Sequence, residues 1–285
     1  MQLLIEVLKA VVLGIVQGIT EWLPISSTGH LILVNQVMPL SVFSDAAMNT
    51  ELINMFTVVI QLGSILAVLV LYFNELNPWA SAKTAEQKKG TWQMWIKIVI
   101  AAVPAGLAGV LFDDMIDAYL YNATVVAIAL IVYGVIFIVM ENQNRKVTTR
   151  SIEGMSRKTA FGIGVFQMLA LIPGTSRSGS TIIGATALGC SRSAAAKFSF
   201  FLAIPMMFGA SAVKLIKTNV TWNAEAVIVL LTGTIVSFIV SVVVIRSFMK
   251  YIRRHSFKLF GVYRIILGII VLILVAMQIL PNALA

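Results

Sequence analysis

Long apolar stretches separated by short polar loops run along the whole chain. A transmembrane helix needs about 20 mostly apolar residues, and six stretches reach that length: 54–73, 94–112, 122–141, 198–216, 225–246 and 259–280. Two further apolar regions, 3–40 and 159–190, are each interrupted by a polar cluster that contains Gly and Pro. Non-helical backbone at membrane depth is tolerated only inside protein or beside a wet cavity. The pattern therefore predicts an all-α polytopic membrane protein with six transmembrane helices and two re-entrant helix pairs.

The amino-acid composition supports this class and excludes others. Hydrophobic residues make up 59% of the 285 residues and charged residues only 12%, and the mean hydropathy is +0.94. A soluble domain carries about 25% charged residues, so this chain has too few to cover a surface in water. Cys190 is the single cysteine, which excludes a disulfide scaffold. The first apolar run contains Glu6 and Lys9, so we expect it to be retained and not cleaved as a signal peptide.

The basic residues indicate the topology of the chain. The loops 74–93, 142–158 and 247–258 hold twelve Lys and Arg residues, whereas the loops 113–121 and 217–224 and the C-terminal tail hold one, Lys217. The 113–121 loop instead carries three acidic residues: Asp113, Asp114 and Asp117. The positive-inside rule places the three basic loops in the cytoplasm. The net charge of +9 is thus a topology signal, and we expect no nucleic-acid partner.

An internal repeat relates the two interrupted regions at a fixed offset of 150 residues. The matching pairs are Gly14 with Gly164, Gln17 with Gln167, Ser26 with Ser176, Thr28 with Ser178, Gly29 with Gly179, and Ile32 with Ile182. Each region is followed by three spans, so the second copy is inverted, as in folds that place their sites where broken helices meet near the midplane. We expect one membrane domain, 1–285, made of repeat 1 (about 1–141) and repeat 2 (about 159–285). The first re-entrant region enters from outside and the second from the cytoplasm.

The two breaks carry the candidate chemistry. Glu21, His30 and Arg177 are their only ionisable residues, and such groups at membrane depth are costly enough to indicate function. Hydroxyl groups, glycine backbone and helix N-termini suit a phosphate, and Arg177 adds a fork of donors. Structural roles are the alternative, because Ser26, Ser27 and Thr28 could cap a half-helix, His30 could be a structural histidine, and Glu21 could pair with Arg177 only to specify packing. Three cations lie near span ends, where snorkelling to the interface would explain them: Lys97, Arg246 and Arg264.

The same two breaks resemble the paired motifs of the undecaprenyl-diphosphate phosphatase family of the bacitracin-resistance type. The first motif leads from Gln17-Gly18-Ile19-Thr20-Glu21 into Pro24-Ile25-Ser26-Ser27-Thr28-Gly29-His30, and the second is Pro173-Gly174-Thr175-Ser176-Arg177-Ser178-Gly179-Ser180-Thr181. The resemblance covers nearly the whole chain. It implies a bacterial plasma-membrane enzyme that converts undecaprenyl diphosphate to the monophosphate, recycles the cell-wall lipid carrier and gives bacitracin resistance. Gln17 stands where many members have Glu, which weakens any role that needs two carboxylates.

Together, the residues and the resemblance give a set of candidate site residues. The catalytic candidates are Glu21, Ser27, His30 and Arg177, and the substrate-binding candidates are Gln17, Ser26, Thr28, Gly174, Ser176, Ser178 and Thr181. A divalent cation, Mg²⁺ or Ca²⁺, is expected at Glu21, with Gln17 as a further ligand, because Mg²⁺ binds through one or two carboxylates plus substrate phosphates.

Two reaction routes and two functions remain open at this stage. In one route Ser27 or Ser26 attacks the terminal phosphorus, Glu21 or His30 takes its proton, and the phosphoserine is hydrolysed later; Ser27 is favoured because it lies closer to His30. In the other route Glu21 or His30 activates a water directly. A polyprenyl-phosphate or anion transporter is the alternative function, because it would need a similar anion-binding site between broken helices. The charge count predicts a site that opens to the external, periplasmic face. The expected partners are a polyprenyl diphosphate and membrane lipid, with a homodimer as one possible assembly.

Overall fold

The computed structural model describes residues 1–143, 145–217 and 222–282, and within these ranges the chain is helical without a β-strand. The side chains of Asp113, Asp114, Asp117 and Lys217, which entered the topology prediction, lie outside the described part. The helices in chain order are α1 (Gln2–Thr20), α2 (Ser27–Val37), α3 (Ala46–Leu71), α4 (Phe73–Leu76), α5 (Ala85–Leu120), α6 (Ala123–Asn142), α7 (Arg157–Met168), the 3₁₀ turn η1 (Leu169–Leu171), α8 (Arg177–Ala187), α9 (Arg192–Lys217), α10 (Ala224–Ile252) and α11 (Lys258–Ala276).

Seven of the described helices are long and apolar enough to cross a bilayer: α1, α3, α5, α6, α9, α10 and α11. Six of them overlap the predicted spans, which confirms an all-α, multi-pass membrane protein. The seventh, α1, was assigned to a re-entrant pair, yet its 19 residues extend about 28 Å at 1.5 Å per residue, close to the thickness of the hydrocarbon core. The helices α2, α7 and α8 have 11, 12 and 11 residues and are too short to span alone. The re-entrant arrangement stays a prediction.

The two breaks end in the same local structure, a serine N-cap with positive φ, and the two serines are 150 residues apart. Ser26 and Ser176 are the N-cap residues of α2 and α8, with φ of 75° and 73°, in the left-handed region that few residues other than glycine adopt. The Ser26 hydroxyl accepts from the N–H of Gly29 at 3.3 Å, and the Ser176 hydroxyl accepts from the N–H of Gly179 at 3.2 Å. Two serines in a strained conformation at equivalent places indicate that contacts with the surrounding structure hold both turns in place.

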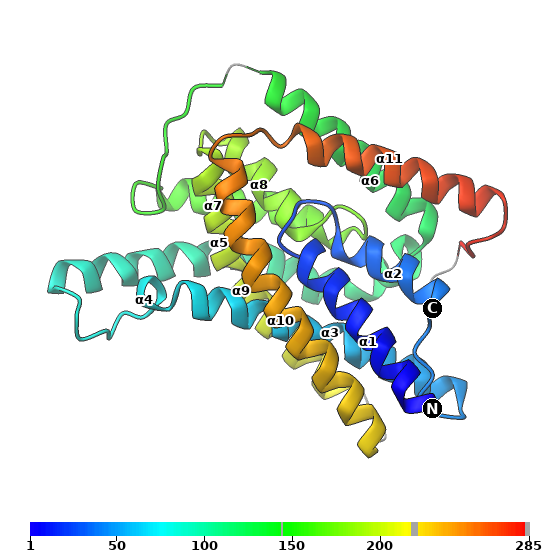
Figure 1. The fold of residues 1–285 in the computed structure, drawn as a ribbon. Coiled ribbons are helices and arrows are strands. Elements are labelled where there is room, and N and C mark those ends of the chain that lie inside the picture. Colours follow the sequence, from blue (N-terminus) through cyan, green and yellow to red (C-terminus); the bar gives the residue numbers. More distant parts are fainter. Residues whose placement is uncertain (144, 218–221, 283–285) are drawn as a thin grey trace.

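The helices that precede the breaks pack against equivalent partners in the opposite half of the chain. Figure 1 shows α1 running beside α10, and α7 packs along α5. Close approach requires small residues at membrane interfaces. A Cβ on Gly14 would come within 2.7 Å of the Gly233 carbonyl oxygen, and one on Gly164 would collide with the Ala101 carbonyl. Exchange of the two halves reproduces this pairing, which agrees with the predicted inverted repeat. The repeat and its boundaries stay a prediction.

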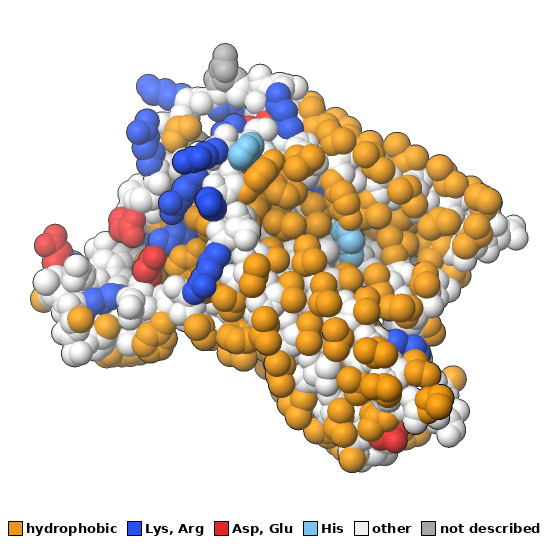
Figure 2. Space-filling model, in the orientation of Figure 1, with side chains coloured by type: hydrophobic (Ala, Val, Ile, Leu, Met, Phe, Trp, Pro, Cys, Tyr) orange, Lys and Arg blue, Asp and Glu red, His pale blue; other side chains and the backbone are white. Residues whose placement is uncertain are grey.

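Buried side chains surround the breaks, and apolar side chains cover the outside. Trp22 of the first break is fully buried and contacts Phe200 of α9 edge-on, with ring centroids 5.3 Å apart. The face in Figure 2 is largely hydrophobic, with Lys and Arg side chains gathered at one end. An apolar exterior around a polar interior is the distribution that a lipid environment favours.

Lys97 of α5 corrects one prediction from the sequence. Its ammonium does not snorkel to an interface but is buried, and it donates to the carbonyl oxygens of Ile152 and Glu153 at 2.9 and 2.8 Å. The loop between α6 and α7 supplies these acceptors, a long-range contact that a position near a span end does not reveal.

Candidate active site

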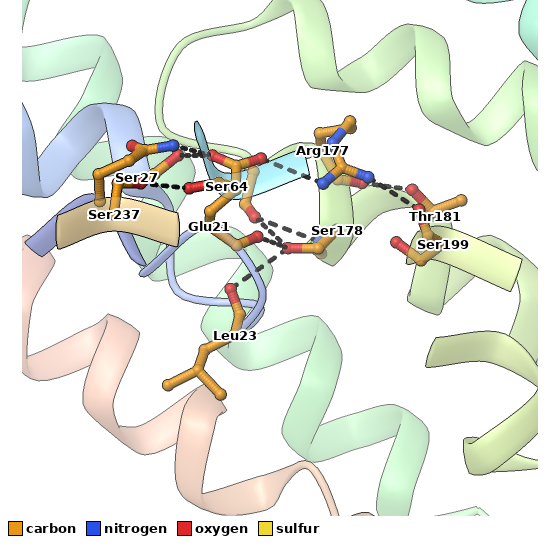
Figure 3. A network of polar contacts seen from close by, with 12 residues as sticks. Glu21, Leu23, Ser27, Ser64, Arg177, Ser178, Thr181, Ser199 and Ser237 are labelled. Atoms are coloured by element: carbon orange, nitrogen blue, oxygen red, sulfur yellow. Dashed lines mark hydrogen bonds and ion pairs between the residues drawn. The ribbon is translucent and has the colours of Figure 1, made fainter. Parts of the chain in front are cut away.

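Glu21 is the centre of the polar network between the two breaks (Figure 3). It follows α1 directly and is 7% exposed. Its Oε2 accepts from Ser27 Oγ at 2.8 Å and from Gln17 Nε2 at 3.0 Å, and its Oε1 accepts from Arg177 Nη2 at 3.1 Å. Gln17 and Glu21 are four residues apart and therefore share one face at the end of α1. One carboxylate thus connects three of the candidate residues.

Arg177 reaches this carboxylate from the other half of the chain. It is the first residue of α8, and its side chain is 14% exposed. Nη1 donates to the Ser199 carbonyl oxygen of α9 at 2.9 Å, while the guanidinium lies 5.8 Å from the centre of the Trp22 ring. The Nε atom is buried and has no hydrogen-bond partner among the described residues. Arg177 therefore keeps a donor that an anionic ligand at this site would satisfy.

Ser178 joins the two breaks through the backbone. Its buried hydroxyl lies within hydrogen-bond distance of the carbonyl oxygens of Glu21 and Leu23, at 3.3 and 3.2 Å, and of Ser176 Oγ at 3.1 Å. Figure 3 shows this link from α8 to the turn that carries Glu21. A serine hydroxyl has one proton to donate, so the Ser178 hydroxyl serves one of these carbonyls at a time.

Arg264 of α11 holds both breaks, which corrects the prediction that it snorkels. The side chain is fully buried. Its Nη1 donates to the Pro24 carbonyl oxygen of the first break at 3.1 Å, and its Nη2 donates to the Gly174 carbonyl oxygen of the second at 2.8 Å. The guanidinium also lies 5.3 Å from the centre of the Tyr133 ring. A planar fork with five donors is suited to binding several carbonyls at once.

Both ring nitrogens of His30 form hydrogen bonds to residues other than Ser27. Nδ1 lies 2.7 Å from the Ser26 carbonyl oxygen, and Nε2 lies 2.6 Å from the Tyr263 hydroxyl, whose ring stacks on the imidazole. A carbonyl only accepts, so Nδ1 carries the proton and Nε2 of the neutral ring accepts from Tyr263. The Ser27 hydroxyl instead donates to Glu21. Of the two bases left open for Ser27, Glu21 and His30, the structure places Glu21 within hydrogen-bond distance of its hydroxyl.

The remaining candidates lie at the two helix starts. Gly174 has φ of +93°, and a Cβ there would approach the Val126 carbonyl oxygen to 2.6 Å, so only glycine fits. Thr181 is buried and its hydroxyl donates to the Arg177 carbonyl within α8, whereas Thr28 is half-buried. Ser26 and Ser176 are caps, as described above. Hydrogen bonds bring four of the candidates to Glu21: Gln17, Ser27, Arg177 and Ser178. The structure commits four hydroxyls to internal bonds, those of Ser26, Ser176, Ser178 and Thr181.

The donor atoms around Glu21 fit a cation that is shared with a phosphate. Within the described ranges, no group of three or more His, Cys, Asp or Glu residues is placed so that it could hold a metal ion. However, Gln17 Oε1 is buried without a hydrogen-bond partner among those residues, and Gln17 Nε2 lies 3.0 Å from Glu21. One carboxylate and one amide oxygen, completed by phosphate oxygens and water, match the way Mg²⁺ binds.

Comparison with known proteins identifies the family of this chain. Residues 10–270 match the model of the bacitracin resistance protein BacA. The chain belongs to the BacA family. It is 56% identical to undecaprenyl-diphosphatase 1 of Clostridioides difficile (strain 630) over 269 residues, which cover 94% of this chain and 96% of that protein. It is also 54% identical to the undecaprenyl-diphosphatase of Acetivibrio thermocellus, over 95% of this chain and 98% of that protein.

A third relative of this BacA-family chain is the undecaprenyl-diphosphatase of Enterococcus faecalis. The two are 52% identical over 276 residues, which cover 95% of this chain and 98% of the relative. The family resemblance seen in the two motifs is therefore confirmed over nearly the full length.

Sequence reasoning missed two residues of this BacA-family site, and both lie in α11. Tyr263 contacts His30, and Arg264 contacts both breaks. A signal for Arg264 was present, because it lies six residues into α11 (Lys258–Ala276) and the helix continues for twelve more residues without another charge. A cation placed this far from a helix end is costly to leave in lipid and calls for a protein partner.

Proposed function

We infer that this chain is an undecaprenyl-diphosphatase, an integral membrane enzyme that hydrolyses undecaprenyl diphosphate to undecaprenyl phosphate and phosphate. This reaction recycles the lipid carrier for cell-wall synthesis and gives resistance to bacitracin. Membership of the BacA family and the printed names of its relatives support the activity. The observation that carries the assignment to this site is the 2.8 Å hydrogen bond from Ser27 Oγ to Glu21 Oε2, beside Arg177.

We propose Ser27 as the nucleophile and Glu21 as its base. Ser27 Oγ forms a bond to the terminal phosphorus while the bridging P–O bond breaks, and the serine proton passes to Glu21 and on to the departing undecaprenyl phosphate. In the second step Glu21 takes a proton from water, the water oxygen attacks the phosphoserine, and the proton returns to Ser27 Oγ as phosphate leaves. A base within hydrogen-bond reach of the hydroxyl is the arrangement that this chemistry needs.

Arg177 is proposed to bind the phosphate that is transferred. Charge on the equatorial oxygens must be neutralised during phosphoryl transfer, and the unpartnered Nε of Arg177 is available for it. Ser27 and Arg177 are the first residues of α2 and α8, so free N–H groups of two helix N-termini lie next to the two reacting side chains. Thr28 is proposed to line the same phosphate site, and Ser176 and Ser178 are proposed to shape it through their internal hydrogen bonds.

Gln17 and Glu21 are proposed to hold Mg²⁺ or Ca²⁺ through Gln17 Oε1 and the carboxylate. The cation supplies further neutralisation of the diphosphate charge when it is bound. His30 is proposed as a positioning residue, because its bond to the Ser26 carbonyl holds the turn that presents Ser27.

We propose that the enzyme lies in the bacterial plasma membrane with its site open to the periplasmic face. The distribution of Lys and Arg over the loops supports this orientation. All proposed site residues come from one chain, so the monomer is proposed as the catalytic unit whether or not the chain forms a homodimer. No nucleic-acid partner is proposed.

Phosphate release from undecaprenyl diphosphate by the protein purified in detergent tests the function. The wild type should release phosphate, Ser27→Ala should lower the rate by at least about a thousandfold if the nucleophile is lost, and the exposed Ser247→Ala should match the wild type. Acid-quenched enzyme should carry phosphoserine at Ser27. Release without phosphoserine would replace the covalent route by direct attack of water, and no release by the wild type would refute the function.

A further inference from the structure

A surface hollow at the C-terminal end of α10 is lined almost entirely by cations. Its volume is about 430 Å³, and its lining residues are Arg246, Met249, Lys250, Arg253 and Arg254. We call this hollow the basic pocket. Figure 2 shows Lys and Arg side chains gathered over this end of α10, whereas hydrophobic side chains cover the rest of the helix on that face. The basic pocket lies outside the site around Glu21 and has no part in the proposed reaction.

The cations of the basic pocket lack acidic partners. No ion pair in the described part of the chain includes any of the four. A neighbouring hollow of about 290 Å³ shares Met249 and Arg253 and is also lined by two acidic residues, Glu75 and Glu153. The Glu75 carboxylate pairs with Lys197, and no ion pair among the described residues joins Glu153 to a cation of the basic pocket. Like charges gathered in a hollow repel one another and focus a positive potential that attracts a counter-anion.

An exposed apolar stripe leads along α10 to the basic pocket. Leu231, Ile235, Ile239 and Val243 are all exposed and follow one another at intervals of four residues. At 100° per residue, these four residues and the helical cations Arg246 and Lys250 fall within about 120° of the helix circumference, so they form one continuous face. Arg253 and Arg254 follow directly after the last residue of α10. An apolar track that ends in cations has the shape and polarity of a phospholipid, with its acyl chain along the helix and its headgroup at the end.

The positive-inside rule alone explains why basic residues occur in this loop, but it does not account for their arrangement. It requires an excess of Lys and Arg near the ends of spans and makes no demand that they share one hollow, stand in line with an apolar stripe or lack carboxylate partners. Lys88 and Lys89 satisfy the rule at the start of α5 and line neither of the hollows described above.

We propose that the basic pocket binds the phosphate headgroup of an anionic phospholipid whose acyl chain lies along the exposed face of α10. Guanidinium groups bind phosphate oxygens in a bidentate manner, and basic pockets between or beside membrane helices are suited to anionic headgroups. A zwitterionic lipid binds less well, because its ammonium group is repelled by the four cations.

Native mass spectrometry of the full-length protein in neutral detergent tests this proposal. The probes are dioleoyl phosphatidylglycerol and dioleoyl phosphatidylcholine, which carry the same acyl chains. The wild type should retain one phosphatidylglycerol with a Kd at least about tenfold below that for phosphatidylcholine, since each Lys or Arg near an anionic headgroup adds to the attraction. Equal Kd values for the two lipids would overturn the proposal.

A charge-matched pair of variants localises the binding. The variant Arg246→Gln/Lys250→Gln/Arg253→Gln should raise the Kd for phosphatidylglycerol at least about tenfold. The control Lys88→Gln/Lys89→Gln/Lys158→Gln removes the same charge from the starts of α5 and α7 and should change this Kd less than about twofold. An equal loss of affinity for phosphatidylglycerol in both variants would indicate non-specific electrostatic attraction and would overturn the proposal that the lipid binds in the basic pocket. If thermal unfolding shows that the triple variant does not fold, Arg253→Gln against Lys89→Gln makes the same comparison.

A soluble headgroup separates a lipid site from a site for free phosphate esters. Glycerol 1-phosphate at the concentration of the lipid should not displace phosphatidylglycerol, because it lacks the acyl chain that follows the α10 stripe. Displacement at equal concentration would overturn the proposal in favour of a free-anion site. All these readouts are binding measurements, so they hold whether or not the chain hydrolyses undecaprenyl diphosphate.

Discussion

Arg177 Nη2 and Glu21 Oε1 lie 3.1 Å apart and connect the two breaks, although the two residues are 156 positions apart in the chain. Both side chains are largely buried, so each charge depends on the other for compensation. Removing one partner of a buried pair is costly because the second charge is left without compensation. Loss of either charge is therefore expected to destabilise the site.

Arg177→Lys is expected to lower the phosphatase rate by about 10- to 100-fold. The substitution keeps the charge, but an ammonium lacks the planar fork that reaches Glu21 and the Ser199 carbonyl together. A hydrogen bond to a charged group contributes about 1.5–3 kcal/mol, which corresponds to this range. Phosphate release at saturating substrate measures the effect. A rate within twofold of the wild type would reduce Arg177 to a general counter-charge.

Gln17→Glu is expected to lower the half-saturating concentration of Mg²⁺ by a few-fold. It places a second carboxylate next to Glu21, and added ligand charge tightens the binding of hard cations. Without a cation, the two adjacent carboxylates repel each other, so the variant should also unfold at a lower temperature in the presence of a chelator. Rates measured across a Mg²⁺ titration, with Gln87→Glu as an exposed control, test this. An unchanged titration would argue against Gln17 as a ligand.

Arg264→Met is expected to destabilise the protein and to lower its activity. Methionine fills similar space but donates no hydrogen bond, so the carbonyls of Pro24 and Gly174 lose their donors in a buried site. An unsatisfied buried polar group costs about 1–3 kcal/mol. The midpoint of thermal unfolding in detergent should fall, whereas the exposed Arg157→Met should leave it unchanged. Equal midpoints for the two variants would show that α11 does not hold the breaks together.

Cysteine labelling in intact spheroplasts should assign the face on which the site opens. Thr28→Cys on a Cys190→Ala background should react with an impermeant thiol reagent added outside, and undecaprenyl diphosphate should protect it. Met115→Cys should label from outside and Arg150→Cys only from inside-out vesicles, as the loop charges predict. Labelling of Thr28→Cys only from inside-out vesicles would reverse the proposed orientation.

The wild-type thiol provides a background check for this labelling. Cys190 is buried, and burial raises its pKa to about 11. Because only the thiolate reacts, labelling of the wild type should be slow near neutral pH and should accelerate as the pH rises towards 11. Rapid labelling at pH 7 would show that this part of the chain opens in solution.

The sequence by itself determined the features that depend on local properties. The length of each apolar stretch sets the number of residues that can cross a bilayer, and the cost of charge in lipid marks Glu21 and Arg177 as candidates. Serine followed three residues later by glycine, at positions 26 and 176, indicated that the two breaks are alike, and the structure confirms that both serines cap helices.

The tertiary structure decided which groups meet. Ser27 donates to Glu21 and not to His30, His30 bonds to Tyr263, and Arg264 binds both breaks. Hydropathy and spacing specify neither the direction of a side chain nor the packing of helices more than 100 residues apart. The sequence therefore does not distinguish burial of Arg264 and Lys97 from snorkelling to an interface. Their burial depends on carbonyl groups that other segments of the chain bring to them.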